Sequence, residues 1–297
     1  MTPSGIVIVD TPAGLTSHDV VHQLRKLYGT RKVGHAGTLD PMATGVLVIG
    51  IKAATRLLGH LSGTTKEYQA TIRLGASSTT DDREGELGER CDTSHIDDAA
   101  IYVARESQLG TVMQVPSSVS AKRVDGKRAH ALARSGEHFE LEAAQVRIDS
   151  FEIQGINRES GWIDIDVNVV CSSGTFIRAI ARDLGSDLGV GGHLIQLRRT
   201  RVGPFTIEDS VNLNELMESD NPSSRIIDMG KIAKQIWPHI VVSDSDRQKI
   251  AYGQRLAVVD LPEASLLALL DGQGALIALA RVTPEAMEYR AVFIGSS

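Results

Sequence analysis

The chain has 297 residues, of which 42% are hydrophobic, which is enough to form one large domain or a large domain with a small one. Its two cysteines, Cys91 and Cys171, exclude a disulfide framework and form no C-x-x-C pair, so a reduced cytoplasmic setting fits best. The formal net charge of −6 argues weakly against a nucleic-acid partner, and the distribution of charge has to decide.

The N-terminal half of the chain alternates between apolar runs and helical patterns. Strands are indicated by the runs at 6–10 and 46–51, and by the alternation of KEYQATIRLG at 66–75. Ser17 is placed to cap a helix that Gly29 ends. We also expect a short helix at 53–61, a polar surface loop at 76–95 and a helix near 97–109.

The C-terminal half contains two alternating strands, a helix and a further strand before the pattern changes. The segments VRIDSFEIQGI and WIDIDVNVVCS should be antiparallel neighbours. Further elements are expected at 129–134 (helix), 177–184 (helix), 193–207 (strand), 215–235 (partly helical), 244–252 (helix), 256–260, 266–271 and 275–282 (strands). These patterns predict an α+β protein with a large mixed, mostly antiparallel sheet over 1–235 and a small β-rich domain over 237–297.

No segment suggests export or a membrane anchor. MTPSGIVIVD lacks the basic flank and long apolar run of a signal peptide, and VLVIGI is far too short to cross a membrane. We therefore expect a cytoplasmic protein.

Basic residues gather in two places within this acidic chain. One group lies between Lys122 and Arg134, and the other between Arg178 and Arg201. Local basic patches can bind a polyanion, and they can equally be solvated surface.

The stretch GHAGTLDPMATG at 34–45 contains three glycines and a single carboxylate, Asp40, directly before Pro41. Aspartate in this position can cap a helix or start a turn. Glycines also let a ligand approach closely, so the same carboxylate could act as a nucleophile or a general base. The residues alone leave both interpretations open.

Two further side chains are candidates. Arg178 lies in the first turn of a predicted helix, where its charge opposes the helix dipole, so a carboxylate or phosphate partner is expected unless it is a surface arginine. Tyr68 is either a core aromatic or a platform on which a base stacks. No G-x-S-x-G, P-loop, H-E-x-x-H or cysteine cluster occurs, so neither a metal nor a cofactor is indicated.

Six stretches together resemble one family, the TruB-type tRNA pseudouridine synthases, over roughly residues 5 to 210. They occur in the family's order: DTPAGLTSHDVV, GHAGTLDPMATGVLVIG, KEYQATIRLG, VPSSVSAKRVDGKRAHALARSGE, SSGTFIRAIARDLG and GGHLIQLRRTRVGPF. The pattern V-P-S-S-V-S-A resembles the actinobacterial version of the family. The end of the chain loosely resembles the small PUA-like domain of such enzymes.

The resemblance implies a pseudouridine-synthase fold and an enzyme that isomerises uridine 55 in the T loop of tRNA, without a cofactor. It implies that Asp40 is the essential aspartate, that Tyr68 stacks on the target base and removes the carbon-5 proton, and that Arg178 pairs with the aspartate. His35 would hold the T loop, and residues 117–146 would be a mobile segment that closes on the RNA. The basic residues expected to contact RNA are Lys122, Arg123, Lys127, Arg128, Arg198, Arg199 and Arg201.

The chain departs from the family's pattern at a few positions. Thr11 stands where lysine is usual, while Phe176, Val119 and His130 stand where tyrosine is commoner. We expect a monomer without an obligate protein partner, whose ligand is the tRNA T-stem-loop. The alternative from a different functional class is a non-catalytic RNA-binding or tRNA-folding protein in which Asp40 only shapes a turn.

Overall fold

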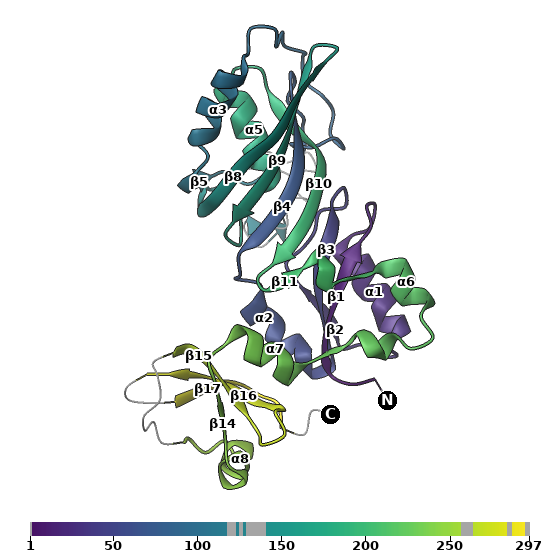
Figure 1. Cartoon of the computed structure of the whole chain (residues 1–297), viewed down its shortest axis with the longest axis vertical. Helices are drawn as coiled ribbons and strands as arrows, with labels where there is room; N and C mark the ends of the chain where they lie inside the picture. The colour runs from purple at the N-terminus through teal and green to yellow at the C-terminus, as the bar shows by residue number, and fades with distance from the viewer. Residues whose placement is uncertain are drawn as a thin grey trace. The chain divides into compact units, whose positions relative to one another are not determined.

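The computed structural model describes residues 2–117, 123–124, 127–128, 141–256, 264–283 and 287–294. The chain forms two compact units (Figure 1). The first comprises Met1–Leu39, Val46–Ser62 and Pro204–Ser297, and the second comprises Asp40–Gly45 and Gly63–Gly203.

The second unit is built on six strands in the order β3-β10-β4-β9-β8-β5. Their bounds are β3 Thr44–Ile51, of which only the first two residues belong to this unit, β10 Gly192–Val202, β4 Lys66–Leu74, β9 Trp162–Cys171, β8 Ala144–Glu159 and β5 Gly110–Gln114. The pairing of β3 with β10 is parallel, whereas the other four pairings are antiparallel. The mixed, mostly antiparallel sheet expected from the alternating runs is confirmed.

Two helices pack with this sheet. Helix α5 (Ile177–Asp187) lies against β10 and β4, and α3 (Asp98–Glu106) packs beside α5 (Figure 1). The buried residues of α5 include Ile177, Ile180, Ala181 and Leu184, which are the four apolar positions at helical spacing. The amphipathic pattern of the sequence therefore fixes which face of α5 turns to the sheet.

The first unit contains a smaller set of strands and helices around its own apolar core. Strand β1 (Gly5–Thr11) lies between β3 and β12, with β13 paired to it antiparallel and β2 paired to β3. The remaining elements are α1 Ser17–Leu27, β2 Val33–Ala36, η1 Lys52–Leu57, α2 Leu58–Leu61, β11 Phe205–Thr206, η2 Ile207–Asp209, β12 Val211–Asn212, α6 Leu213–Glu218, η3 Pro222–Arg225, β13 Ile227–Asp228 and α7 Met229–Ile236.

The end of the chain adds a four-stranded sheet in the order β14-β15-β16-β17 to the first unit. Its strands are His239–Val241, Ala264–Leu270, Leu276–Val282 and Met287–Val292, and helix α8 (Asp244–Ala251) precedes β15. Buried aliphatic residues such as Leu267, Leu269 and Ala280 form a core for this sheet. The expected small β-rich C-terminal part is therefore present. Strands β14 and β17 were not predicted: β14 has only three residues, and the alternation of β17 (MEYRAV) extends over six residues at the very end of the chain.

The predicted cap of α1 was wrong, whereas its predicted end is confirmed. The cap of α1 is Thr16 and not Ser17, because the Thr16 side chain accepts from the Asp19 amide while the Asp19 carboxylate accepts from the Thr16 amide. Gly29 ends this helix with a φ of +60°, as expected. The expected helix at 129–134 and nearly all of the expected strand at 256–260 lie outside the described residues. Within the described part of the chain, no helix is both long and apolar enough to span a membrane.

Candidate active site

Asp40 is the first residue of a tight turn. Its backbone carbonyl oxygen accepts a hydrogen bond from the Ala43 amide at 3.0 Å, with Pro41 and Met42 at the centre of the turn. Aspartate favours the first position of such a turn and proline the second. The chain leaves the turn directly into Thr44 and Gly45, which pair with Arg198 and Arg199 of β10. The turn is therefore tied to the sheet, and it presents the Asp40 side chain from a fixed backbone.

Gly45 is required where this turn joins the sheet. Its φ is +105°, and a β-carbon added there would lie 2.2 Å from the backbone carbonyl oxygen of Arg199. No other residue type fits both the dihedral angle and the close approach. This glycine of the GHAGTLDPMATG stretch thus brings the Asp40 turn against β10.

Asp40 and Arg178 form a two-pronged ion pair. The distance from Arg178 Nε to Asp40 Oδ2 is 2.9 Å, and that from Nη2 to Oδ1 is 3.0 Å. Parallel hydrogen bonds of this kind fix the orientation of a carboxylate as well as binding it. The Arg178 side chain is only 4% exposed, whereas that of Asp40 is 34% exposed. A buried cation thus holds a carboxylate that a ligand can still reach.

The guanidinium of Arg178 is also held from its other side. Its Nη1 donates to the backbone carbonyl oxygen of Thr80 at 3.2 Å and lies 3.4 Å from Oδ2 of Asp82. Arg178 sits at the second position of α5, where a cation is unfavourable for the helix dipole. Two carboxylates and a carbonyl compensate for this placement, and a partner carboxylate is what the sequence reasoning expected.

Asp82 is a site residue that the sequence reasoning missed. Its side chain is only 4% exposed, and its Oδ1 accepts hydrogen bonds from the Thr80 hydroxyl at 2.5 Å and from the Glu84 amide at 3.0 Å. The expectation that 76–95 is wholly a surface loop is wrong at this point, because Asp81 and Asp82 are both buried. The segment was predicted to be exposed because its composition is polar and acidic. The carboxylates of Asp81 and Asp82 nevertheless point inward and pair with arginines of α5.

Tyr68 lies on the buried face of β4, with Ala70 two residues further along the same face. Burial is the main cause that raises the pKa of the Tyr68 phenol, and the negative charge of Asp40 adds to it. The guanidinium of Arg199 acts in the opposite direction through its charge and through a hydrogen bond to the phenol. The structure therefore brings Asp40, Arg178 and Tyr68 together within one unit.

The other residues predicted to contact RNA differ in burial and in their partners. Arg198 is half-buried and donates to the Thr44 hydroxyl at 3.2 Å, and Arg201 pairs with Glu67 at 2.9 Å. Arg199 is 1% exposed. His35 lies in β2 of the first unit, with its ring edge-on to His18 at 5.7 Å between centroids.

The basic residues of the expected closing segment are described in part. Lys122 lies outside the described residues, as do Val119, His130 and most of 117–146. Arg123 belongs to β6 (Arg123–Val124), and Lys127 and Arg128 form β7 (Lys127–Arg128); the two short strands pair antiparallel.

Two of the departures from the family pattern can be placed. Thr11 ends β1 and is 1% exposed. Phe176 is the N-terminal cap residue of α5, and its amide and carbonyl are both bonded by the Gln114 side chain, at 2.8 and 3.1 Å. These two hydrogen bonds fix the start of the helix that carries Arg178. They involve the main chain of Phe176, so they do not need the hydroxyl of a tyrosine at this position.

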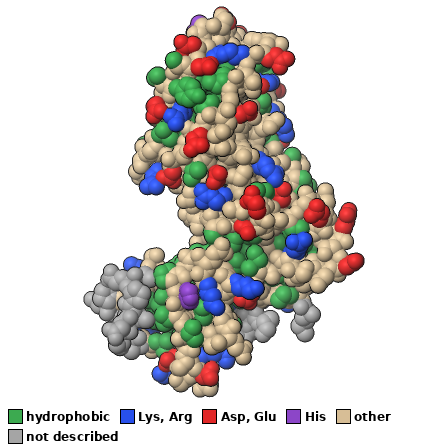
Figure 2. All heavy atoms as spheres, viewed as in Figure 1, with side chains coloured by type: hydrophobic (Ala, Val, Ile, Leu, Met, Phe, Trp, Pro, Cys, Tyr) green, Lys and Arg blue, Asp and Glu red, His purple; other side chains and the backbone are tan. Residues whose placement is uncertain are grey.

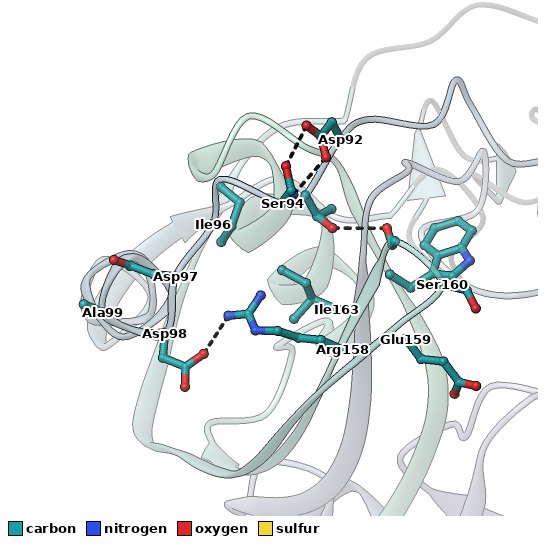
Figure 3. A pocket seen from close by; sticks show the side chains of 13 residues that line it. Asp92, Ser94, Ile96, Asp97, Asp98, Ala99, Arg158, Glu159, Ser160 and Ile163 are labelled. Carbon is teal, nitrogen blue, oxygen red and sulfur yellow. Dashed lines mark hydrogen bonds and ion pairs between the residues drawn. The ribbon is translucent and has the colours of Figure 1, made fainter.

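A pocket of about 760 Å³ in the second unit has the wrong charge for RNA (Figure 3). Its lining residues include four acids, Asp92, Asp97, Asp98 and Glu159, and the side chain of Arg158 points to Asp98 at 2.6 Å. Carboxylates would repel phosphate groups.

On the face shown in Figure 2, acidic and basic side chains are interspersed. Among the described residues, no three His, Cys, Asp or Glu side chains gather in an arrangement that could hold a metal ion.

Two family models match the chain between residues 25 and 232. Residues 25–177 match the model of the TruB family pseudouridylate synthase N-terminal domain. Residues 178–232 match that of the tRNA pseudouridylate synthase B C-terminal domain. Asp40, Tyr68 and Asp82 fall in the first match and Arg178 is the first residue of the second.

Curated relatives and a solved structure extend these matches. The chain is 52% identical over 253 residues to the tRNA pseudouridine synthase B of Corynebacterium efficiens, covering 85% of this chain and 84% of that protein. It is 47% identical over 296 residues to that of Thermobifida fusca, covering 98% and 99%. Both organisms are actinobacteria, in agreement with the resemblance noted for the V-P-S-S-V-S-A pattern. A chain in the structure of an H/ACA RNP bound to a substrate RNA containing 2′-deoxyuridine superimposes with a TM-score of 0.73 at 24% identity, covering 99% of this chain and 86% of that one, which shows the shared fold.

Proposed function

Since the chain belongs to the TruB family of pseudouridylate synthases, we propose that it isomerises uridine 55 in the T loop of tRNA to pseudouridine, with Asp40 as the essential carboxylate. The observation that carries this proposal is the ion pair between Asp40 and Arg178. A buried arginine holds a one-third exposed carboxylate on a rigid turn, as a reacting group needs.

The target base has to leave the stack before Asp40 can reach it. A base in a loop of RNA is accessible to this kind of extrusion, and an aromatic side chain gives it a surface to stack on. Tyr68 is a buried aromatic residue of the same unit, and its phenol lies close enough to Asp40 for the charge of that carboxylate to act on it. We assign it the contact with the flipped uracil.

The chemistry that follows separates uracil from its sugar and rejoins it through carbon 5. Asp40 either adds to the sugar or the base, or promotes elimination to a glycal. When carbon 5 bonds to carbon 1′ of the sugar, an Asp40 bonded to carbon 1′ is displaced and a glycal regains its proton at carbon 2′, whereas an Asp40 bonded to carbon 6 leaves as the C5–C6 double bond forms. Both routes end with loss of the carbon-5 proton. In that step the C5–H bond breaks, its electron pair closes the C5–C6 double bond, and Tyr68 takes the proton. The nitrogen that lost the sugar gains a proton from solvent, so the overall reaction is an isomerisation. This sequence of steps calls for no cofactor.

Binding of the T-stem-loop is assigned to basic residues from both halves of the chain. We propose His35, Arg198 and Arg201 for this role, together with Lys122, Arg123, Lys127 and Arg128 of the closing segment 117–146. Residues 1–235 would form the catalytic domain and 237–297 a small PUA-like domain. We do not propose an RNA contact for Arg199, because its side chain is only 1% exposed.

The test is incubation of the purified protein with unmodified tRNA, without added metal or cofactor, followed by mapping of pseudouridine. The proposal predicts catalytic turnover and product at position 55 alone. Binding of tRNA without product at stoichiometric protein would favour the alternative, an RNA-binding or tRNA-folding protein. Product at another uridine would keep the enzyme class and refute the position.

A further inference from the structure

Arg199 is a fully buried cation whose side chain the chemistry above does not use. It is the largest side chain, by residue volume, among the described residues that are less than 2% exposed. Arginine is almost never fully buried without a specific partner, because removing its charge from water costs several kcal/mol, to order of magnitude. Its position therefore needs an explanation beyond filling space.

Sheet register places Arg199 between the two strands that carry the site. On one side it is the antiparallel partner of Tyr68 on β4. On the other it is the parallel partner of Gly45, five residues after Asp40. The main chain of Gly45 approaches Arg199 so closely that a β-carbon added to Gly45 would lie 2.2 Å from the Arg199 carbonyl oxygen.

The side chain of Arg199 turns toward the Tyr68 phenol. Tyr68, Ala70, Leu197 and Arg199 are all buried, and their alternation along β4 and β10 puts them on one face of the sheet. Arg199 donates a hydrogen bond to the phenol oxygen. Directly opposed side chains in an antiparallel pair are close enough for such a contact.

The other ionisable groups around Tyr68 do not take over this task. The negative charge of Asp40 disfavours a phenolate, and burial raises the pKa of the Cys171 thiol to about 11. Burial and the charge of Arg199 lower the pKa of Lys66 to about 8. Lys66 therefore loses its proton, and with it its positive charge, more readily than Arg199 does. Arg199 is the cation that donates to the phenol.

We propose that Arg199 is a positioning residue, which orients the Tyr68 hydroxyl toward the base and stabilises the phenolate oxygen that receives the carbon-5 proton. This inference rests on the proposed function, since it concerns the proton-removal step. A phenol that accepts a proton has to release its own to solvent first. A guanidinium hydrogen-bonded to the oxygen favours this charged form in a buried site.

The test compares Arg199→Met and Arg199→Lys with wild type in single-turnover reactions. The substrates are tRNA with ordinary uridine and tRNA with uridine deuterated at carbon 5. We expect Arg199→Met to slow the reaction about 10- to 100-fold, which is within the range of general base catalysis. The isotope effect at carbon 5 should rise above the wild-type value, because proton removal becomes the slow step. Arg199→Lys should recover part of the rate and lie between the two in isotope effect.

A second arm makes the change depend on Tyr68. In a Tyr68→Phe background, adding Arg199→Met should cause little further loss of rate, since the group that Arg199 assists is gone. Arg73→Met is the matched control, because Arg73 lies on the same strand, pairs with Asp164 and takes no part in the site. It should keep the wild-type rate and isotope effect.

The outcomes separate this inference from the proposed function. A wild-type protein that makes no pseudouridine refutes both. An active wild type whose Arg199 variants lose rate with an unchanged isotope effect, and lose it equally in the Tyr68→Phe background, gives Arg199 a purely structural role. If Arg199→Met fails to fold, Arg199→Lys decides alone: a wild-type rate and isotope effect would overturn the inference.

Discussion

Arg178 grips Asp40 with two parallel hydrogen bonds and is itself held from behind by Asp82, whose Oδ2 lies 3.4 Å from Nη1. The two groups that hold Asp40 in place are buried, and the carboxylate that would react is the more exposed one. Asp82 and Arg178 are both 4% exposed, and the outermost carboxylate, Asp40, is 34% exposed. Two buried groups thus fix the direction in which one accessible carboxylate points.

Replacing Arg178 by lysine should show that the reaction needs the two parallel hydrogen bonds to Asp40 as well as the positive charge. Lysine keeps the cation but cannot make two parallel hydrogen bonds, so the Asp40 carboxylate loses its fixed orientation. We expect a loss of about 100-fold in the single-turnover rate, typical of small misplacements of reacting groups. Arg73→Lys disturbs a similar two-pronged pair with Asp164 outside the site and should leave the rate unchanged. Equal rates for wild type and Arg178→Lys would contradict this account.

Replacing Asp82 by asparagine should impair the reaction although Asp82 is buried behind Arg178. The variant keeps the shape of the side chain but removes the charge that faces Arg178, so the guanidinium can shift. We expect a rate loss of about 10-fold or more and a stability loss of roughly 1–3 kcal/mol. Binding of tRNA, measured by filter retention, should stay near wild type. Asp164→Asn is the matched control, and an equal rate loss in that variant would mean that the effect is general destabilisation.

Gly45→Ala should be more damaging than its dihedral angle alone explains. Gly189 has a comparable left-handed conformation, with a φ of +71°, but nothing lies within 4 Å of an added β-carbon. Gly189→Ala should therefore cost about 1–2 kcal/mol of stability, for conformational reasons alone. Gly45→Ala adds a clash with the Arg199 carbonyl and should cost more. It should also slow pseudouridine formation, since the Asp40 turn is displaced. Urea unfolding and single-turnover assays of both variants check this, and equal stability losses would refute the close approach.

Lys66 should leave a signature in the pH dependence of stability. Its pKa in the folded protein is lowered from 10.5 to about 8, mainly by burial. Between these values the unfolded chain binds a proton that the folded chain does not, so the contribution of Lys66 to stability rises with pH in this window. Below it, the buried ammonium disfavours folding. The free energy of unfolding of wild type relative to Lys66→Met should therefore increase from pH 7.5 to pH 10, to use roughly the two ends of the window. A difference that stays constant with pH would show that Lys66 is not perturbed.

The strands that carry the site could be predicted because they follow simple rules. β4 alternates strictly between buried and more exposed positions, and the apolar residues of α5 recur at helical spacing, so period alone located them. The residues at which helices begin were harder to predict. Thr16 and Ser17 are both good caps, and which of them begins α1 depends on the reciprocal bonds with Asp19.

The site could be predicted only in part. The Asp-Pro pair indicated a turn, and the turn exists. The flanking glycines left a chemical role for Asp40 open, and only the resemblance of six stretches to one family favoured that role. Asp82 could not be found in this way, and Arg199 was expected to contact RNA and not to lie buried beside Tyr68, because both positions come from long-range packing. A one-residue change in the register of β10 against β4 would place Arg199 on the other face of the sheet, and nothing local in RRTRVG reveals that register.

The most direct test of the central claim is Asp40→Asn, assayed for both tRNA binding and pseudouridine formation. Asparagine keeps the turn and the shape of the side chain but removes the charge that the chemistry needs. We predict that the affinity for unmodified tRNA stays near wild type while no pseudouridine forms, even at stoichiometric enzyme and long times. Full pseudouridine formation by Asp40→Asn would contradict the assignment of Asp40 as the reacting carboxylate.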